Sequence, residues 1–224
     1  MKFVIGDIHG EITKLSRLIA VLEKHGIDQL IFLGDYIDKG ENSKKTLIFL
    51  EELSQKYKCV FLLGNHEYAW LQFIKSGGHR DFLIKYGGEK TMKDFRMSKL
   101  TPQAAKMALY FPHQQFFNGL KKFLIVGDYV ISHSGINPRY YDMKNWDKLD
   151  EKEFVFQRYN VISYDGLMQG KKQIIGHTAF PKPFVDEFKI GIDTGAALVK
   201  NTPLTAFAIE GEYFINHFGE KQNL

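Results

Sequence analysis

Three short apolar runs alternate with two stretches of helical periodicity in the first part of the chain. The runs are Lys2–Ile5, Gln29–Leu33 and Lys58–Leu63, and each has the length of a buried strand. Between them, Glu11–His25 and Ser43–Lys56 carry apolar residues three and four positions apart, as helices with one buried face do. This order of strand, helix, strand, helix and strand predicts a parallel sheet with right-handed crossovers.

Each of these predicted strands ends in glycine and then in side chains that bind metals. The segments that follow are Gly6–Gly10 (Gly-Asp-Ile-His-Gly), Gly34–Gly40 (Gly-Asp-Tyr-Ile-Asp-Lys-Gly) and Gly64–Glu67 (Gly-Asn-His-Glu). Further on, His133 and His177 each end another apolar run. We expect these side chains in one crevice at the carboxyl edge of a sheet. Oxygen and imidazole donors without thiolate suit manganese, iron or zinc better than a structural thiolate zinc site.

The five motifs, taken in order, resemble those of the calcineurin-like metallophosphoesterases. More narrowly, they are similar to the phosphoprotein phosphatase group in its short bacterial and phage form. The resemblance runs from Lys2 to about Phe214, and the departure is Lys39, where that group usually carries arginine. It implies an α/β protein with the calcineurin-like metallophosphoesterase fold, a two-sheet β sandwich flanked by helices in α/β/β/α layers.

The resemblance also implies a metal-binding role for six residues. They would hold two divalent ions, manganese in first place and iron or zinc otherwise. The ligands are Asp7, His9, Asp35, Asn65, His133 and His177. Asp7 and His9 would bind the first ion, the last three residues of the set would bind the second, and Asp35 would bridge both.

Four further residues would act on the substrate. The resemblance makes His66 the general acid that protonates the leaving oxygen, with Asp38 holding its other ring nitrogen. Lys39 and Arg158 are the candidate phosphate clamps. Arg158 closes Phe154–Arg158, which loosely resembles the Leu-Leu-Trp-x-Arg segment of the bacterial members. A hydroxide that bridges the two ions would then attack phosphorus in line, without a phosphoenzyme.

Several functions share these motifs. The first hypothesis is a serine/threonine protein phosphatase, and the second is a symmetrical diadenosine tetraphosphate hydrolase. The third motif of those hydrolases usually reads Gly-Asn-His-Asp, whereas this chain has Glu67. A catalytically dead binding module should lack ligands, and none is missing. Net charge is +4 without a concentrated basic stripe, so no nucleic-acid partner is expected; the partners would be phosphoproteins or small phosphate esters.

The chain of 224 residues favours a single metallophosphoesterase domain, 1–224. Residues 77–119 are the least regular part, and we read them as a small helical insertion beside the site. Its aromatic residues Phe111, Phe116 and Phe117 are expected to form its own core. A single cysteine excludes an internal disulfide and fits a reducing, cytoplasmic location, and no apolar run approaches the roughly 18 residues of a membrane span.

The later apolar runs predict further strands. Lys122–Val126 and Tyr129–His133 flank Gly127-Asp128, a two-residue turn typical of a hairpin. Gln173–Gly176 and the runs near the end of the chain are also predicted to be strands, mostly joined by hairpins.

Overall fold

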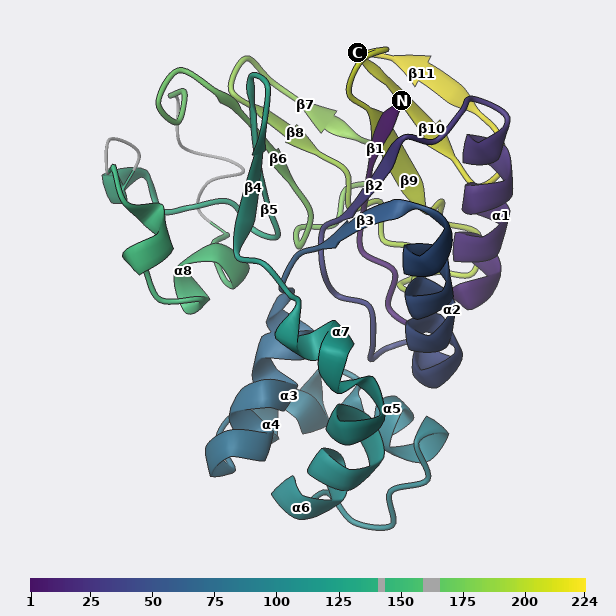
Figure 1. Ribbon diagram of the computed structural model, residues 1–224, viewed down its shortest axis with the longest axis vertical. Helices are drawn as coiled ribbons and strands as arrows, with labels where there is room; N and C mark the ends of the chain where they lie inside the picture. Colours follow the sequence, from purple (N-terminus) through teal and green to yellow (C-terminus); the bar gives the residue numbers. More distant parts are fainter. Residues whose placement is uncertain (141–143, 159–165) are drawn as a thin grey trace.

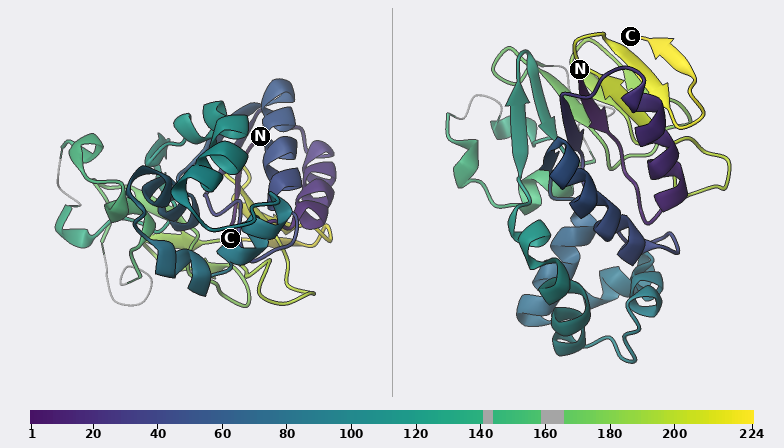
Figure 2. Two further views of the ribbon diagram at one scale, coloured as in Figure 1. Left: turned by 90° about the horizontal axis from the view of Figure 1, so that it is seen from below. Right: turned by 45° about the vertical axis from the view of Figure 1, so that its right-hand side comes forward.

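The computed structural model describes residues 1–140, 144–158 and 166–224, and its core is a sandwich of two mixed β-sheets (Figures 1 and 2). The first sheet has six strands. In sheet order they are β11 (Lys221–Asn223), β10 (Tyr213–Asn216), β9 (Thr205–Ala208), β1 (Lys2–Ile5), β2 (Gln29–Phe32) and β3 (Lys58–Phe61). Strands β1, β2 and β3 are parallel, as predicted, and β9 pairs antiparallel with β1. Helices α1 (Ile12–Glu23) and α2 (Ser43–Lys56) form the two crossovers.

The second sheet has five strands. In sheet order they are β4 (Phe123–Val126), β5 (Tyr129–Ser132), β6 (Lys172–Ile175), β8 (Lys189–Gly191) and β7 (Phe184–Val185). The hairpin predicted at Gly127-Asp128 joins β4 to β5. The expectation that hairpins join most later strands is wrong for β5, β6 and β8, which are parallel. Parallel neighbours need a connection long enough to carry the backbone back to the end of the sheet where the previous strand began.

Three apolar clusters show how the layers pack. The first joins the outer face of the six-stranded sheet to α1 and α2, with fully buried Leu15 and Leu47. The second lies between the sheets, where Ile31 and Ile174 meet. The third joins the five-stranded sheet to α8 (Lys152–Val155) and to the 3₁₀ turn Trp146–Lys148. Helices therefore lie outside both sheets, in the predicted α/β/β/α order.

The remaining helices gather at one end of the sandwich, below the sheets in Figure 1. They are α3 (Asn65–Ser76), α4 (Arg80–Lys85), α5 (Gly88–Asp94), α6 (Pro102–Ala105), a π-helical turn (Lys106–Tyr110), a 3₁₀ turn (Phe111–His113) and α7 (Gln114–Asn118); another 3₁₀ turn, Pro138–Tyr140, lies nearer α8 in sequence. Phe116 and Phe117 are buried, and Phe116 packs against Tyr36 and Phe61 of the sandwich, whereas Phe111 is 46% exposed. Within the described ranges, no helix combines the length and apolarity needed to cross a membrane.

Candidate active site

The loops after β1, β2 and β3 are fastened to one another through their backbones. The N–H groups of Ile8 and His9 donate to the carbonyl of Asp35 at 3.1 and 2.8 Å, and Gly10 donates to Tyr36 at 2.8 Å. Five candidate site residues have left-handed backbone conformations, with φ from 48° to 68°. They are His9, Asp35, Asp38, Lys39 and His177. Such conformations cost roughly 1–3 kcal/mol each and cluster at functional sites, so the loops are held in place by the surrounding fold.

Two glycines let the backbone approach the candidate metal ligands closely. A Cβ atom at Gly64 would collide with the backbone nitrogen and Oδ1 of Asp35. A Cβ atom at Gly176 would collide with Oδ1 of Asp7. The glycine that precedes each ligand segment is therefore required by packing and does not merely terminate a strand.

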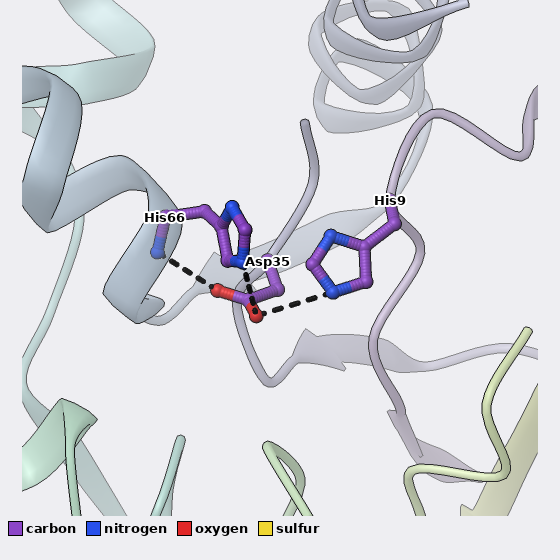
Figure 3. A group of neighbouring side chains, drawn as sticks. All are labelled: His9, Asp35 and His66. Atoms are coloured by element: carbon purple, nitrogen blue, oxygen red, sulfur yellow. Dashed lines mark hydrogen bonds and ion pairs between the residues drawn. The ribbon is translucent and has the colours of Figure 1, made fainter. Parts of the chain in front are cut away.

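Asp35 lies at the centre of the site, between two groups of histidines. Its Oδ2 lies 3.3 Å from Nε2 of His9, and its Oδ1 lies 3.5 Å from Nε2 of His133 (Figure 3 shows the first of these contacts). Burial favours a higher pKa for Asp35, but the facing histidines, His133 first, hold it well below its usual range. An ionised carboxylate with one oxygen directed to each group has the geometry of a bridging ligand.

The group on the Oδ1 side contains His133, His177 and Asn65. Asn65 Oδ1 lies 2.9 Å from Nε2 of His133 and 2.8 Å from Nδ1 of His177. His133 Nδ1 donates to the carbonyl of Leu33 at 2.9 Å, which leaves the lone pair on Nε2 facing the site. Burial lowers the pKa of His133 to about 4 and that of His177 to about 2. Both imidazoles are neutral at pH 7, the state that binds a metal ion.

On the Oδ2 side, Asp35 faces His9. His9 Nδ1 donates to the carbonyl of Ile37 at 2.9 Å, so Nε2 faces Asp35. The buried carboxylate of Asp7 accepts the backbone N–H of His177 at 3.1 and 3.2 Å. Burial, Asp193 and Asp35 raise its pKa well above its ordinary value, and the charge of Lys39 and the N–H of His177 offset only part of that rise.

Among the described residues, two sets of close donor atoms could each hold an ion. One set is Asp35, His133 and His177, as the sequence analysis expected. The other is His9, Asp35 and His66, drawn in Figure 3. Asp7 lies at the same sheet edge but outside both sets, and its role as a metal ligand stays a prediction. The donors are oxygen and nitrogen atoms throughout, so the residues present fit two divalent ions.

His66 is held by an unusually complete set of contacts. Its Nδ1 donates to Oδ2 of Asp38 at 2.7 Å, and Asp38 is fully buried. The Asp38 carboxylate also accepts Nε1–H of Trp70 at 2.9 Å and the hydroxyl of Thr91 at 2.5 Å. Burial lowers the pKa of His66, but Asp35 and Asp38 outweigh it and raise the pKa above its ordinary value. The pair predicted from the sequence therefore lies together, with Nε2 of His66 directed toward Asp35.

The two predicted phosphate clamps reach the same pocket. Lys39 is half-buried, and its Nζ donates to Nε2 of His9 at 2.7 Å. Arg158, which follows α8, is exposed and lines the pocket with Lys39. The pocket has a volume of about 220 Å³, and half-buried or exposed aromatic rings form another part of its wall; these are Phe82, Tyr86 and Phe156. A pocket with cations and metal-type ligands on one side and rings on another can bind a phosphate ester of an apolar group.

Sequence reasoning missed the residue that fixes the Asp35 turn. Glu67 is fully buried, and its carboxylate accepts the N–H groups of Asp35, Tyr36 and Ile37 at 2.9, 2.9 and 3.3 Å. The sequence analysis used Glu67 only to compare substrate classes. Its position directly after Gly-Asn-His was a signal that it lies near the site, but its partners could not be read from local pattern because they lie 30 to 32 residues earlier in the chain.

Thr91 and Trp70 were missed as well, because neither belongs to a motif. Asp193 lies in a turn where its Oδ1 accepts the N–H of Gly195 at 2.8 Å. The negative charge of Asp193 also raises the pKa of Asp7.

Comparison with solved structures places the fold among phosphatases. A cold-active protein-tyrosine phosphatase of a psychrophilic Shewanella species has a TM-score of 0.71 at 14% identity, covering 100% of this chain and 80% of that one. A protein provisionally assigned as a diadenosine tetraphosphatase scores 0.66 at 18% identity, covering 96% and 91%. A serine/threonine phosphatase from Saccharomyces cerevisiae scores 0.55 at 15% identity, covering 92% and 71%. At these identities the likeness shows the fold alone.

The family itself is shown by the sequence. The family model for calcineurin-like phosphoesterases matches residues 3–211, which is most of the chain. The match includes every candidate ligand described above and both groups of histidines. The chain belongs to the calcineurin-like phosphoesterases, a family of metal-dependent phosphoester hydrolases.

Proposed function

We propose that this chain is a dinuclear phosphomonoesterase of the phosphoprotein phosphatase group, which acts on phosphorylated side chains of proteins, phosphoserine and phosphothreonine first. The observation that carries this proposal is the position of Asp35. Its two oxygens face different histidine groups at 3.3 and 3.5 Å. A single carboxylate placed in this way supports two adjacent ions, and a pair of ions suits displacement at a phosphoryl centre.

The ions, when bound, would activate a water molecule and neutralise the phosphoryl oxygens. The chain's own residues would do the rest. Lys39 and Arg158 would bind the phosphoryl oxygens from the pocket wall through charge-assisted hydrogen bonds. His66, held by Asp38 at 2.7 Å, would give a proton to the leaving oxygen. The buried Asp38 would stabilise the protonated imidazole and fix its orientation.

Metal removal tests the proposed function. We expect a chelator to abolish hydrolysis and added manganese to restore it, with iron or zinc as weaker alternatives, because all candidate donors are oxygen or nitrogen atoms. The assay should use purified protein with p-nitrophenyl phosphate, and metal content should be measured in parallel. Full turnover by protein that contains no metal would overturn the proposal.

A substrate panel tests the finer part. A phosphoserine peptide, p-nitrophenyl phosphate and diadenosine tetraphosphate should be compared at equal enzyme concentration. Preference for the phosphopeptide supports a protein phosphatase, and strong preference for the dinucleotide would support the polyphosphate hydrolase instead. Absence of turnover on every substrate, with both ions bound, would identify a binding module.

A further inference from the structure

Lys39 contacts a candidate metal ligand as well as the pocket. Its Nζ lies 2.7 Å from Nε2 of the buried His9, and its side chain also lines the pocket that contains Arg158. Nε2 of His9 is the nitrogen that faces Oδ2 of Asp35 at 3.3 Å, in the set of donors His9, Asp35 and His66 (Figure 3). The lysine that replaces the usual arginine therefore touches one of the two sets that could hold an ion.

The hydrogen bonds of His9 leave a single lone pair, and it is on Nε2. His9 Nδ1 lies 2.9 Å from the carbonyl oxygen of Ile37, which can only accept, so Nδ1 carries the proton. Nε2 accepts a hydrogen bond from the Lys39 ammonium, which has three donors and no acceptor. A nitrogen that accepts this hydrogen bond cannot use the same lone pair to bind a metal ion. Lys39 and an ion on this side therefore exclude each other at His9.

The side chain of Lys39 can leave His9 while its backbone stays in place. The N–H of Lys39 donates to the carbonyl of Gly87 at 3.4 Å, and a Cβ atom at Gly87 would lie 2.7 Å from that nitrogen. A Cβ atom at Gly40 would collide with the carbonyl oxygen of His9, so the loop is packed just as closely after Lys39. A flexible stem of four carbons joins this fixed backbone to the ammonium. Rotation of the stem can carry Nζ from His9 into the pocket without a movement of the loop.

A phosphoryl group in the pocket offers Lys39 a stronger partner than His9. The His9 imidazole is neutral, because burial and then the charge of Lys39 lower its pKa. Phosphoryl oxygens are anionic, and an ammonium group binds an anionic oxygen more strongly than a neutral nitrogen. The two contacts of Lys39 are alternatives, and the contact with phosphate is favoured once a phosphate ester is bound.

We propose that Lys39 competes with the ion on this side for Nε2 of His9, and that a phosphate ester releases His9 by drawing Lys39 away. The inference rests on the proposed function, in which Lys39 binds phosphate, and adds control of metal binding to it. Without substrate, the set of Asp35, His133 and His177 binds its ion more tightly than the set that contains His9. Phosphate and the more weakly bound ion then bind cooperatively, and the coupling is reciprocal.

A calorimetric titration of metal-free protein with manganese tests the competition. We expect two binding events, of which His9→Asn should remove the weaker and leave the tighter. Lys39→Ala, and Lys39→Met, which keeps the stem, should each tighten the weaker event about tenfold or more, because they remove a charge-assisted hydrogen bond to His9. The tighter event should change little.

Arg158→Ala is the matched control for this titration. It removes one positive charge from the same pocket and leaves the contact between Lys39 and His9 in place. We expect it to change the weaker event by less than about threefold, since Arg158 is exposed. An unchanged weaker event in both Lys39 variants, or equal tightening by Arg158→Ala, would overturn the inference.

Methylphosphonate, a phosphoryl ligand without an ester bond to hydrolyse, tests the release of His9. When it is saturating, the weaker event should tighten in the parent and in Lys39→Ala, but about tenfold more in the parent, where an ammonium must leave His9. Equal tightening in the two proteins would overturn the inference, because a phosphate-binding lysine that never covers His9 leaves this ratio unchanged. If the parent hydrolyses no monoester, the proposed function fails, whereas the two titrations still decide the inference.

Discussion

The loops at the sheet edge and the helical segment 77–119 contribute to the site in different ways. The loops Gly6–Gly10 and Gly34–Gly40 supply candidate metal ligands, and their backbones bond to one another between neighbouring strands. The helical segment supplies no candidate ligand. It reaches the site through the side chains of Thr91 on Asp38 and Phe82 against His66, and the Gly87 carbonyl accepts the N–H of Lys39 at 3.4 Å. Under the proposed function, the loops would therefore provide the chemistry, and the helical segment would position the acid.

The largest effect is expected from a substitution of the shared ligand, Asp35, in the loops. Asp35→Asn should lose most bound metal and nearly all activity, because Asp35 faces both histidine groups. His9→Asn, which faces one group, should keep more metal. Metal analysis of both variants after gel filtration is the measurement. Full metal occupancy in the Asp35 variant would show that Asp35 is not the shared ligand. The loops would then not hold the ions in the way proposed.

The second-largest effect is expected from substitution of the proposed acid, His66. His66→Asn should lower kcat by roughly 10²–10⁴-fold with little change in KM, because the leaving oxygen gains charge only in the transition state. The loss should be smaller for p-nitrophenyl phosphate than for a phosphoserine peptide, since p-nitrophenolate leaves without much protonation. Steady-state kinetics on both substrates measures this. Equal losses would argue against an acid and would favour His66 as a metal ligand, a possibility raised by its place in the set of His9 and Asp35.

Substitution of Lys39 should have a smaller effect. It tests whether the loops bind the phosphate as well as the ions. Lys39→Ala removes a charge-assisted contact to phosphate worth about 1.5–3 kcal/mol, or roughly tenfold to a hundredfold in kcat/KM. Lys39→Arg should keep activity, because it retains the positive charge and its planar guanidinium can bind two phosphoryl oxygens at once.

Metal content must be measured in both Lys39 variants, because Lys39 Nζ also contacts His9 at 2.7 Å. An Ala variant with unchanged metal and unchanged kcat/KM would assign phosphate binding to Arg158 and the ions alone.

The same two regions differ in how far the sequence predicts them. Strand ends in a parallel sheet converge on one edge, so Asp35, His133 and Asn65 could be expected together from spacing and motif. Strand β1 and helix α2 also have their predicted limits. The parallel arrangement of β5, β6 and β8 could not be read from local pattern, because hairpins and crossovers leave the same short apolar runs.

The contacts of the helical segment were beyond prediction for another reason. Thr91 is 53 residues from Asp38 and lies in a helix without a motif. Its partner is determined by how α5 packs against α2 and the loop that carries Asp38, and sequence periodicity does not predict this packing. Likewise, Phe156 and Arg158, which follow α8 and share the pocket with Phe82, are far from it in sequence.

The smallest expected effect tests whether the helical segment acts on the acid at all. Thr91→Val keeps the shape of the side chain and removes the hydroxyl that donates to Asp38 at 2.5 Å. Trp70 still donates at 2.9 Å, so the carboxylate keeps a partner and the loss should be only part of a hydrogen bond to a charged group. We expect kcat to fall about three- to tenfold while KM changes little, and Thr91→Ser to restore kcat.

A double variant decides whether this loss passes through His66. If Thr91 acts by holding Asp38 against His66, Thr91→Val should have no further effect on kcat in a His66→Asn background, because the group it positions is gone. Multiplication of the two losses would mean that Thr91 only supports α5 in the fold. Denaturant unfolding of each variant provides the check, since a purely structural contact would change the free energy of unfolding without this dependence on His66. The helical segment would then shape the pocket through its rings and leave the acid to the loops.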